Sequence, residues 1–414
     1  MAPDQDRQVN ENHQQPDLEQ LIGDVLKSGD VQALEAFLQR DISEGTTIKC
    51  SQQFLAKLDR FVSRSLEQGD SKSACLGFDI ICKCGKHLKL PGNGQGLSGL
   101  IAQGLIRKIK QWFEKCRQLW IQCGPQWDET LFNLSEDFFE ALMVVHEACK
   151  EGTYKITESF LYPVGQLGVD PRIYILIQKE AIRKFNLILD KIPVELKKER
   201  KILTSQEASD IMIKLAGQIM QGGDYDLQTA LMEALCRMAT PDQRKELADQ
   251  WFSIAHVATA FARVHDSEFE TDCRKFLNLV NGMQGDRRRV YSYPCLEVYL
   301  DKYELLMPAD EKLEEFWIDF NLGSHSISFY FSSADEETQE GQWETICINE
   351  NEVQSYAVTG KKSTSVVKTT VKIIMEDNSS QVVPESQVSL GETEKNKASY
   401  LLPTPSMEVK EFED

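Results

Sequence analysis

Two cysteines and a histidine in the segment CKCGKH, residues 82–87, have the side chains best suited to metal or thiol chemistry. On a helix, Cys82 and Cys84 would point about 200° away from each other, so they are poorly placed to share one ion. No second pair of ligands at matching spacing occurs among the 11 cysteines. The sequence therefore predicts buried structural cysteines here and no metal site.

The histidines and the glycine-rich segments also lack a recognisable chemical motif. The six histidines show no helical metal-binding pair and accompany no nucleophile motif. LPGNGQGLSG (90–99) has no preceding strand and no Gly-Lys-Ser/Thr after it, and TGKKST (359–364) lacks the upstream glycine of a phosphate-binding loop. We predict a surface loop at 90–99, and the sequence favours a non-enzymatic protein with no catalytic residues, cofactor or small-molecule substrate.

Three adjacent arginines, Arg287, Arg288 and Arg289, lie in GDRRRVYSYP (285–294) within a chain of formal net charge -19. We interpret the segment primarily as a joint between helices, with Pro294 starting a further helix over CLEVYLDKYELL. The alternative is that some of these arginines stay exposed beside the next module and bind an acidic partner.

The segment GLIRKIKQWFEKCRQLW (104–120) predicts a helix with an apolar stripe and a basic remainder. The segment carries five cations and one acidic residue, Glu114. The cations are Arg107, Lys108, Lys110, Lys115 and Arg117. They form either a solvated charged face or a docking stripe for an acidic peptide or phosphate groups.

Near the C-terminal end, ASYLLPTPSMEVKEF (398–412) places apolar side chains in polar surroundings, and they are Tyr400, Leu401, Leu402, Met407, Val409 and Phe412. The segment is either an unstructured end or a peptide that orders on a partner surface. In the second case Thr404, which precedes a proline, is a candidate phosphorylation site, because added charge beside the anchors would alter docking.

The length and composition of the chain limit the class of protein that it can be. A chain of 414 residues with 41% hydrophobic and 27% charged residues has ordinary globular values and room for two or three domains. Residues 1–16 contain no apolar run and predict a disordered N-terminus without a secretory signal, and no segment is long and apolar enough to span a membrane. An odd number of scattered cysteines fits reduced thiols in the cytosol or nucleus. The acidic balance argues against a nucleic-acid-coating protein, so direct DNA binding is expected to be weak or indirect.

Residues 17–312 show helical spacing of apolar side chains, as in Phe54, Leu55, Leu58, Phe61 and Val62. Gly-Asp pairs recur near changes of helical pattern, at 29–30, 69–70, 223–224 and 285–286. TPDQ at 240–243 predicts a capping box at the start of another helix. The pattern indicates an armadillo/HEAT-like α-solenoid.

The spacing changes after that region. FWIDFNLGSHSISFYF (316–331) alternates as a strand pair around a turn, with Ile327, Phe329 and Phe331 on one face. We predict a smaller β-rich module at 313–390 and a disordered acidic tail at 391–414.

Four stretches resemble the N-terminal region of the synaptonemal complex protein 2 family, including its shorter paralogue. They are FETDCRKFLNLVNGMQGDRRRVYSYPCLEVYLDKYELLMPADEKLEEFWIDFNLGS (269–324), GGDYDLQTALMEALCRM (222–238), QGLIRKIKQWFEK (103–115) and VVPESQVS (382–389). The likeness extends from about Asp17 to Ser389.

The resemblance implies an armadillo-like helical domain followed by a pleckstrin-homology-like β domain similar to the middle domain of the histone chaperone Spt16. It implies a component of the axial and lateral elements of the meiotic chromosome axis, in the nucleus and associated with centromeres. It further implies assembly with synaptonemal complex protein 3 through a C-terminal coiled coil, and engagement of HORMA-domain proteins by a motif after the β domain.

Two departures from the family pattern stand out. The sequence shows no heptad segment, so we expect the coiled-coil part to be absent from it, and the β region is short for a complete pleckstrin-like module. We expect a truncated or alternatively spliced form, in which a missing central hairpin would leave unpaired strand edges.

Two functions remain to be compared. The first is a structural scaffold of the meiotic chromosome axis that acts in chromosome synapsis. The second is a generic α-solenoid adaptor in nuclear transport or signalling. The extended likeness and the order of helical and β modules favour the first.

Overall fold

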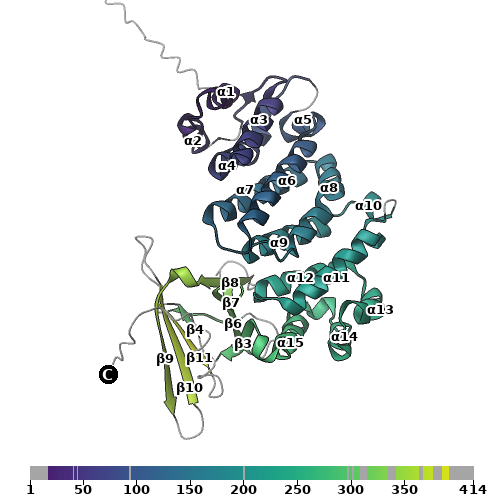
Figure 1. The fold of residues 1–414 in the computed structure, drawn as a ribbon, viewed down its shortest axis with the longest axis vertical. Coiled ribbons are helices and arrows are strands. Elements are labelled where there is room, and N and C mark those ends of the chain that lie inside the picture. Colours follow the sequence, from purple (N-terminus) through teal and green to yellow (C-terminus); the bar gives the residue numbers. More distant parts are fainter. Residues whose placement is uncertain are drawn as a thin grey trace, which may run out of the picture. The chain divides into compact units, whose positions relative to one another are not determined.

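The computed structural model, shown in Figure 1, describes most of the chain between residues 17 and 390. The described residues are 17–40, 42–43, 45–92, 95–198, 201–295, 298–300, 303–307, 315–333, 342–362, 367–375 and 385–390. They divide into two compact units, and the division falls within one helix. The first unit comprises Met1–Pro163, Arg172–Tyr174 and Lys191–Arg200, and the second comprises Val164–Pro171, Ile175–Asp190 and Lys201–Asp414.

The first unit is built from helices that each bury one apolar stripe, together with a short parallel pair of strands. Its helices are α1 (Leu18–Ser28), α2 (Gln32–Leu38), α3 (Phe54–Glu67), α4 (Ser71–Asp79), α5 (Gly96–Ala102), α6 (Leu105–Cys123), α7 (Glu129–Glu147), the first part of α8 (Lys150–Gly168) and α10 (Val194–Lys198). The strands are β1 (Ile48–Lys49) and β2 (Leu88–Lys89). The predicted stripe of α3 is confirmed, because all five of its apolar residues are buried.

Local sequence signals explain where these helices begin and end. The side chains of Asp17, Asp70 and Asp128 accept hydrogen bonds from backbone N–H groups of the first turns of α1, α4 and α7. Gly29, after α1, adopts the left-handed conformation that a glycine tolerates at a helix end. The Gly-Asp pairs at 29–30 and 69–70 therefore mark helix boundaries, as predicted.

The second unit contains the remaining helices. They are the end of α8, α9 (Ile175–Asp190), α11 (Gln206–Gln221), α12 (Tyr225–Met238), α13 (Pro241–Trp251), α14 (Ala255–Phe261) and α15 (Phe269–Gly282). The predicted capping box is confirmed at α13, where Thr240 accepts from Gln243 N–H and the Gln243 side chain accepts from Thr240 N–H. No helix among the described residues is long and apolar enough to cross a membrane.

Two antiparallel sheets complete the second unit. One sheet has the order β3-β6-β7-β8 and the other β5-β4-β11-β10-β9. The strands are β3 (Val290–Cys295), β4 (Val298–Leu300), β5 (Tyr303–Glu304), β6 (Phe316–Asn321), β7 (Ser326–Ser333), β8 (Gln342–Asn349), β9 (Val353–Lys362), β10 (Val367–Met375) and β11 (Glu385–Leu390). Ile327 and Phe329 lie in the core of this module with Phe331 packed against it, so the predicted apolar face of β7 is confirmed.

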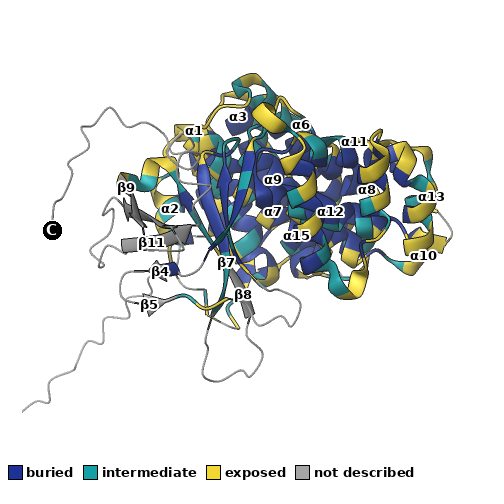
Figure 2. Cartoon of the chain, turned by 90° about the horizontal axis from the view of Figure 1, so that it is seen from below, coloured by how far each residue is buried: buried dark blue, intermediate teal, exposed yellow. Residues whose placement is uncertain are grey.

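The four-stranded sheet is covered on both faces. Alternate residues of β6 point to opposite sides, and Phe316, Ile318 and Phe320 enter the apolar core. On the other side Asp319 and Asn321 are also buried, since this face lies against helices of the same unit. The central strands of the sheet are accordingly coloured as buried in Figure 2.

The prediction of a helix over CLEVYLDKYELL (295–306) is wrong. The segment contributes to β3, β4 and β5, and Pro294 lies inside β3, where it is paired with Trp317 of β6. Long-range pairing with β6 and β11 satisfies the backbone of these residues, and the sequence of the segment does not reveal those partners. The strands of the two antiparallel sheets thus begin at Val290 and not near 313, which adds three strands to the expected β module. The expectation of a missing central hairpin stays a prediction.

Candidate protein-interaction site

The basic joint that follows α15 holds the three arginines in different environments. Arg287 ends the 3-10 turn η5 (Gly285–Arg287), and Arg288 and Arg289 lead into β3. The guanidinium of Arg288 lies 4.8 Å from the ring centroid of Tyr291, and its Nε donates to the carbonyl of Val290 at 2.7 Å. The side chain of Arg288 is therefore engaged by two neighbouring residues, Val290 and Tyr291.

Arg287 and Arg289 are exposed, and neither forms an ion pair within the described part of the chain. The backbone of Arg289 is fixed, because its carbonyl accepts a hydrogen bond from Leu322 N–H at 2.8 Å. Two cations of the predicted triplet are thus presented to solvent from a positioned backbone. Whether an acidic partner binds them stays a prediction.

Two glycine turns meet beside this joint. Gly323 N–H, in the turn between β6 and β7, donates to the carbonyl of Gly223, just before α12, at 2.8 Å. A Cβ atom on Gly223 would lie 2.8 Å from Gly323 Cα and 3.1 Å from Arg289 Cζ. Only glycine permits this approach of two backbones, so the two turns place Arg289 against the start of α12.

A buried ion pair joins α15 to the four-stranded sheet. Arg274 donates to both carboxylate oxygens of Asp319, at 2.7 and 3.0 Å, and Ser292 donates to the same carboxylate at 2.5 Å. The Arg274 guanidinium also lies 3.6 Å from the ring centroid of Tyr225. Burial opposes the charge of Arg274, but Asp319 outweighs it and raises the pKa of the guanidinium.

A second buried cluster joins α9 and α12 to the same sheet. Lys179 Nζ lies 3.5 Å from Asp224 and 3.6 Å from Asp226, while Ser324 donates to Asp224 and Tyr330 donates to Asp226, each at 2.6 Å. Burial raises the pKa of Asp226, and the neighbouring Asp224 raises it further. The pKa of Lys179 is also raised, because the two carboxylates outweigh its burial. The sheet and the three helices are therefore tied by charge-assisted contacts.

The predicted basic helix is α6, and the structure separates its five cations into two groups. Lys108 pairs with Asp59 at 2.6 Å, and Lys115 pairs with Glu67 at 2.6 Å, so α3 neutralises both. Arg117 pairs with Glu114 of α6 itself at 2.9 Å. Arg107 and Lys110 are exposed and form no ion pair among the described residues. Of the five cations in the predicted docking stripe, only Arg107 and Lys110 are thus left without an ion pair among the described residues, and binding of an acidic partner by them stays a prediction.

The tail residues singled out as partner anchors, Tyr400, Leu401 and Phe412, lie outside the described residues, as does Thr404. Their interpretation stays a prediction.

The cysteines of CKCGKH lie in a largely buried part of the first unit. Cys84 is buried and Cys82 half-buried on the π-helical turn η1 (Ile80–Cys84). Burial raises the pKa of both thiols to about 12, which keeps them protonated at neutral pH. The interpretation as structural cysteines fits this environment.

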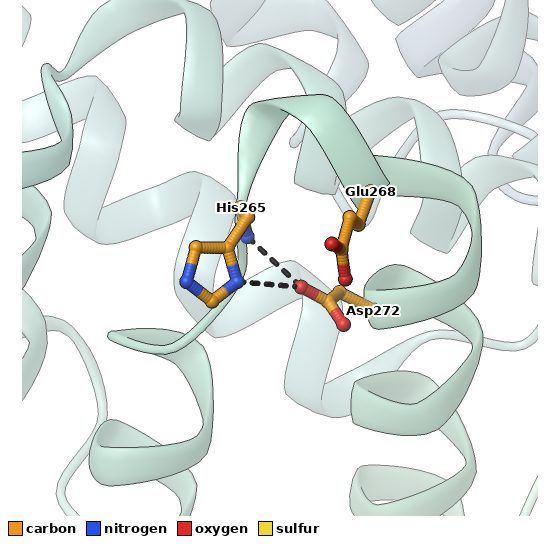
Figure 3. Close-up of side chains that lie close together, drawn as sticks. All are labelled: His265, Glu268 and Asp272. Atoms are coloured by element: carbon orange, nitrogen blue, oxygen red, sulfur yellow. Dashed lines mark hydrogen bonds and ion pairs between the residues drawn. The ribbon is translucent and has the colours of Figure 1, made fainter. Parts of the chain in front are cut away.

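One cluster escaped the sequence analysis. Figure 3 shows His265, Glu268 and Asp272, whose ligand atoms lie within 4.8 Å of one another and could hold a metal ion. Asp272 Oδ2 accepts from the backbone N–H of His265 at 3.0 Å and lies 3.1 Å from its Nδ1, so the carboxylate already closes the turn before α15. The spacing of three and four residues between His265, Glu268 and Asp272 was the signal that could have revealed the cluster, although only Asp272 lies in α15.

Comparison with known proteins defines the family. The synaptonemal complex 2 armadillo-repeat-like domain matches residues 17–196, and the synaptonemal complex 2 Spt16M-like domain matches residues 290–390. A solved structure of a synaptonemal complex protein superposes with a TM-score of 0.80 at 39% identity, covering 93% of this chain and 96% of that chain. The chain belongs to the synaptonemal complex protein 2 family.

Curated members of the synaptonemal complex protein 2 family are longer than this chain. Synaptonemal complex protein 2 of Homo sapiens is 46% identical over 365 residues, which are 86% of this chain and 23% of the human protein. Synaptonemal complex protein 2-like of Xenopus laevis is 35% identical over 353 residues, covering 84% of this chain and 34% of that protein. The predicted family and fold class, an armadillo-like helical region followed by an Spt16M-like module, are confirmed.

The buried junction residues were not predicted from the sequence of this family member. Lys179 and Arg274 stand on otherwise apolar helix faces, and Asp319 stands in a strand, which is an unusual place for a charge. Those positions could have indicated buried partners, but the pairing between residues 45 positions apart required the tertiary structure.

Proposed function

We propose that this chain is a non-enzymatic protein-interaction scaffold of the meiotic chromosome axis, acting in chromosome synapsis and centromere association in the nucleus. Membership of the synaptonemal complex protein 2 family supports a role in that complex. The observation that carries the scaffold role is the buried junction, in which Arg274–Asp319 and the Lys179 cluster tie the sheet to α9, α12 and α15. A sheet and helices tied in this way present the basic joint as one preformed surface.

Acidic segments of axis proteins are the partners proposed for Arg287 and Arg289. Family resemblance supports synaptonemal complex protein 3, HORMA-domain proteins and centromere proteins as candidates. Direct DNA binding is proposed to be weak, since the net charge is -19 and three of the five cations on α6 are already paired.

Localisation in meiotic cells tests the proposal. The variant Arg287→Glu/Arg289→Glu keeps Arg288 and its contacts, so it removes the free cations and spares the joint. The matched control is Arg107→Glu/Lys110→Glu, which makes the same change of charge at two exposed, unpaired cations of the first unit. We expect the tagged wild-type chain and the control to decorate chromosome axes and centromeres, and the joint variant to lose that localisation while keeping its helical circular dichroism.

Two outcomes contradict the proposal. Normal localisation of a folded Arg287→Glu/Arg289→Glu variant would exclude the basic joint as the contact site. Absence of the wild-type chain from meiotic chromosomes, with staining at nuclear pores or signalling complexes, would favour a generic solenoid adaptor.

A further inference from the structure

Helix α15 presents an exposed stripe that its own fold does not use. Lys275, Leu279 and Met283 are spaced four residues apart and therefore lie on one side of the helix. All three are exposed, and Leu279 and Met283 each keep 37% of their surface. The core residues of α15 include Phe276, Leu277 and Val280, of which Leu277 and Val280 point away from these three and Phe276 borders them. The apolar stripe is thus additional to the face that holds the helix in place.

The neighbouring helix extends the apolar part of this surface. His256 of α14 has Nε2 3.0 Å from Sδ of Met283, which places the start of α14 beside the end of α15. Ile254, the residue that caps α14, is also exposed, at 36%. Three of the nine large exposed apolar side chains in the described part of the chain therefore gather at the ends of two adjoining helices. Clustered exposure of this kind marks an interaction surface more than single exposed residues do.

Cations stand at both ends of the stripe. Lys275 lies one turn before Leu279 on α15, and Arg287 follows Met283 in the 3-10 turn η5, after the helix has ended at Gly282. Neither forms an ion pair with a described residue, in contrast to the paired cations of α6. Of the nearby acids, Asp272 is engaged by His265, and Asp286 stands exposed beside Arg287. A free cation at each end of an apolar centre fits a partner with the opposite arrangement.

We propose that the stripe Lys275–Leu279–Met283–Arg287 docks an acidic amphipathic segment of another protein. Its apolar side chains would cover Leu279 and Met283, and its flanking carboxylates would pair with Lys275 and Arg287. This inference rests on the proposed scaffold function and names the chemistry of its partner. Apolar contact supplies affinity in this arrangement, while the two cations fix the register and direction of the segment.

A binding titration on the full chain tests the docking surface. The probe is a fluorescent synthetic peptide with two leucines four positions apart between clusters of glutamate, followed by anisotropy. We expect Leu279→Ser/Met283→Ser and, separately, Lys275→Glu to weaken binding at least about tenfold. The control Arg107→Glu/Lys110→Glu should bind as the wild type does. Replacing the leucines of the peptide by serine, or its glutamates by glutamine, should weaken binding to the same degree.

The outcomes separate this inference from the proposed function. If Arg287→Glu/Arg289→Glu loses axis localisation while Leu279→Ser/Met283→Ser and Lys275→Glu keep both localisation and peptide binding, the scaffold proposal stands and the stripe is excluded. If a synthetic 396–414 peptide of this chain binds the stripe more tightly than the designed peptide, the occupant is the chain's own tail and the partner assignment is overturned. The Lys275→Glu arm keeps the test decisive if the double serine variant fails to fold.

Discussion

Arg274 of α15 and Asp319 of β6 form a two-point ion pair in the interior of the second unit, with Asp319 completely buried. The guanidinium is further held between the rings of Tyr225 and Trp317, at 3.6 and 5.5 Å from their centroids. The fixed fork of an arginine matches both oxygens of a carboxylate, so the pair sets the position and the rotation of the strand on the helix. The polar face of the sheet is thereby fixed on α15, as Ser324 and Tyr330 fix it on α12.

Removing one member of this pair should destabilise the protein strongly. Asp319→Ala leaves the Arg274 charge buried without its counterion, and we expect a loss of about 3–5 kcal/mol in the free energy of unfolding. The double variant Arg274→Met/Asp319→Leu should recover much of this loss, because no charge is then left unpaired. Urea denaturation of the whole chain, monitored by circular dichroism, measures both changes in the free energy of unfolding.

The exposed pair of Lys245 and Asp242 provides the matched control. Both side chains are largely exposed and 3.9 Å apart, so Asp242→Ala should cost less than about 1 kcal/mol. Equal effects of Asp319→Ala and Asp242→Ala would show that the buried pair does not fix the junction.

The contact between Gly223 and Gly323 predicts a strict requirement for glycine. A methyl group on either residue would lie 2.7 to 2.8 Å from the other's Cα, so the turns must separate and weaken the Gly323-to-Gly223 hydrogen bond. We expect Gly223→Ala to cost about 1–3 kcal/mol, as overpacking does. Gly217→Ala within α11 meets nothing within 4 Å and should be neutral or stabilising by about 0.5–1 kcal/mol. Thermal denaturation of the two variants, measured side by side, compares their stabilities. A Gly223→Ala variant as stable as the wild type would contradict the prediction.

His146 predicts a loss of stability in acid. It is fully buried in α7, neither ring nitrogen has a hydrogen-bond partner among the described residues, and burial lowers its pKa below the ordinary 6.5. Below that value the unfolded chain binds a proton that the folded imidazole does not, so this residue makes stability fall as pH decreases. The contribution to the slope is at most about 1.4 kcal/mol per pH unit.

Replacing His146 isolates that contribution. We expect His146→Leu to match or exceed the wild-type stability at pH 7 and to show a shallower loss between pH 6.5 and more acidic values, in urea titrations at each pH. The wild-type chain, measured in parallel at each pH, is the reference. A His146→Leu slope that is identical to the wild type would show that the buried imidazole is not the group responsible.

Local signals in the sequence predicted several features of the helices. The stripe of α3, the Gly-Asp pair before α4 and the capping box of α13 each depend on residues that are close together in the chain. The alternation in β7 similarly predicted which side chains share a face, because a strand has a period of two. The resemblance to the family then gave the order of the two modules.

Local signals failed where the partner is distant. The segment 295–306 has apolar spacing compatible with a helix, but pairing of β3 with β6 and of β4 with β11 makes it strands. The polar side of β6 would be solvent-facing on a lone sheet, yet Asp319 is buried by α15. Strand pairing and sheet covering are long-range contacts, so no window of sequence contains their cause.

The basic residues show the same division between what sequence and tertiary structure determine. The sequence by itself determined that Arg287, Arg288 and Arg289 form a charged segment and that α6 is a basic helix, but it predicted a joint between two helices, whereas the segment joins α15 to β3. Only the tertiary structure decided that Arg288 stacks on Tyr291, that Asp59 and Glu67 neutralise Lys108 and Lys115, and that Arg287 and Arg289 stay free within the described chain. The physical reason is that the availability of a charge depends on which opposite charge lies within a few ångströms, and folding brings such charges together from positions far apart in the chain.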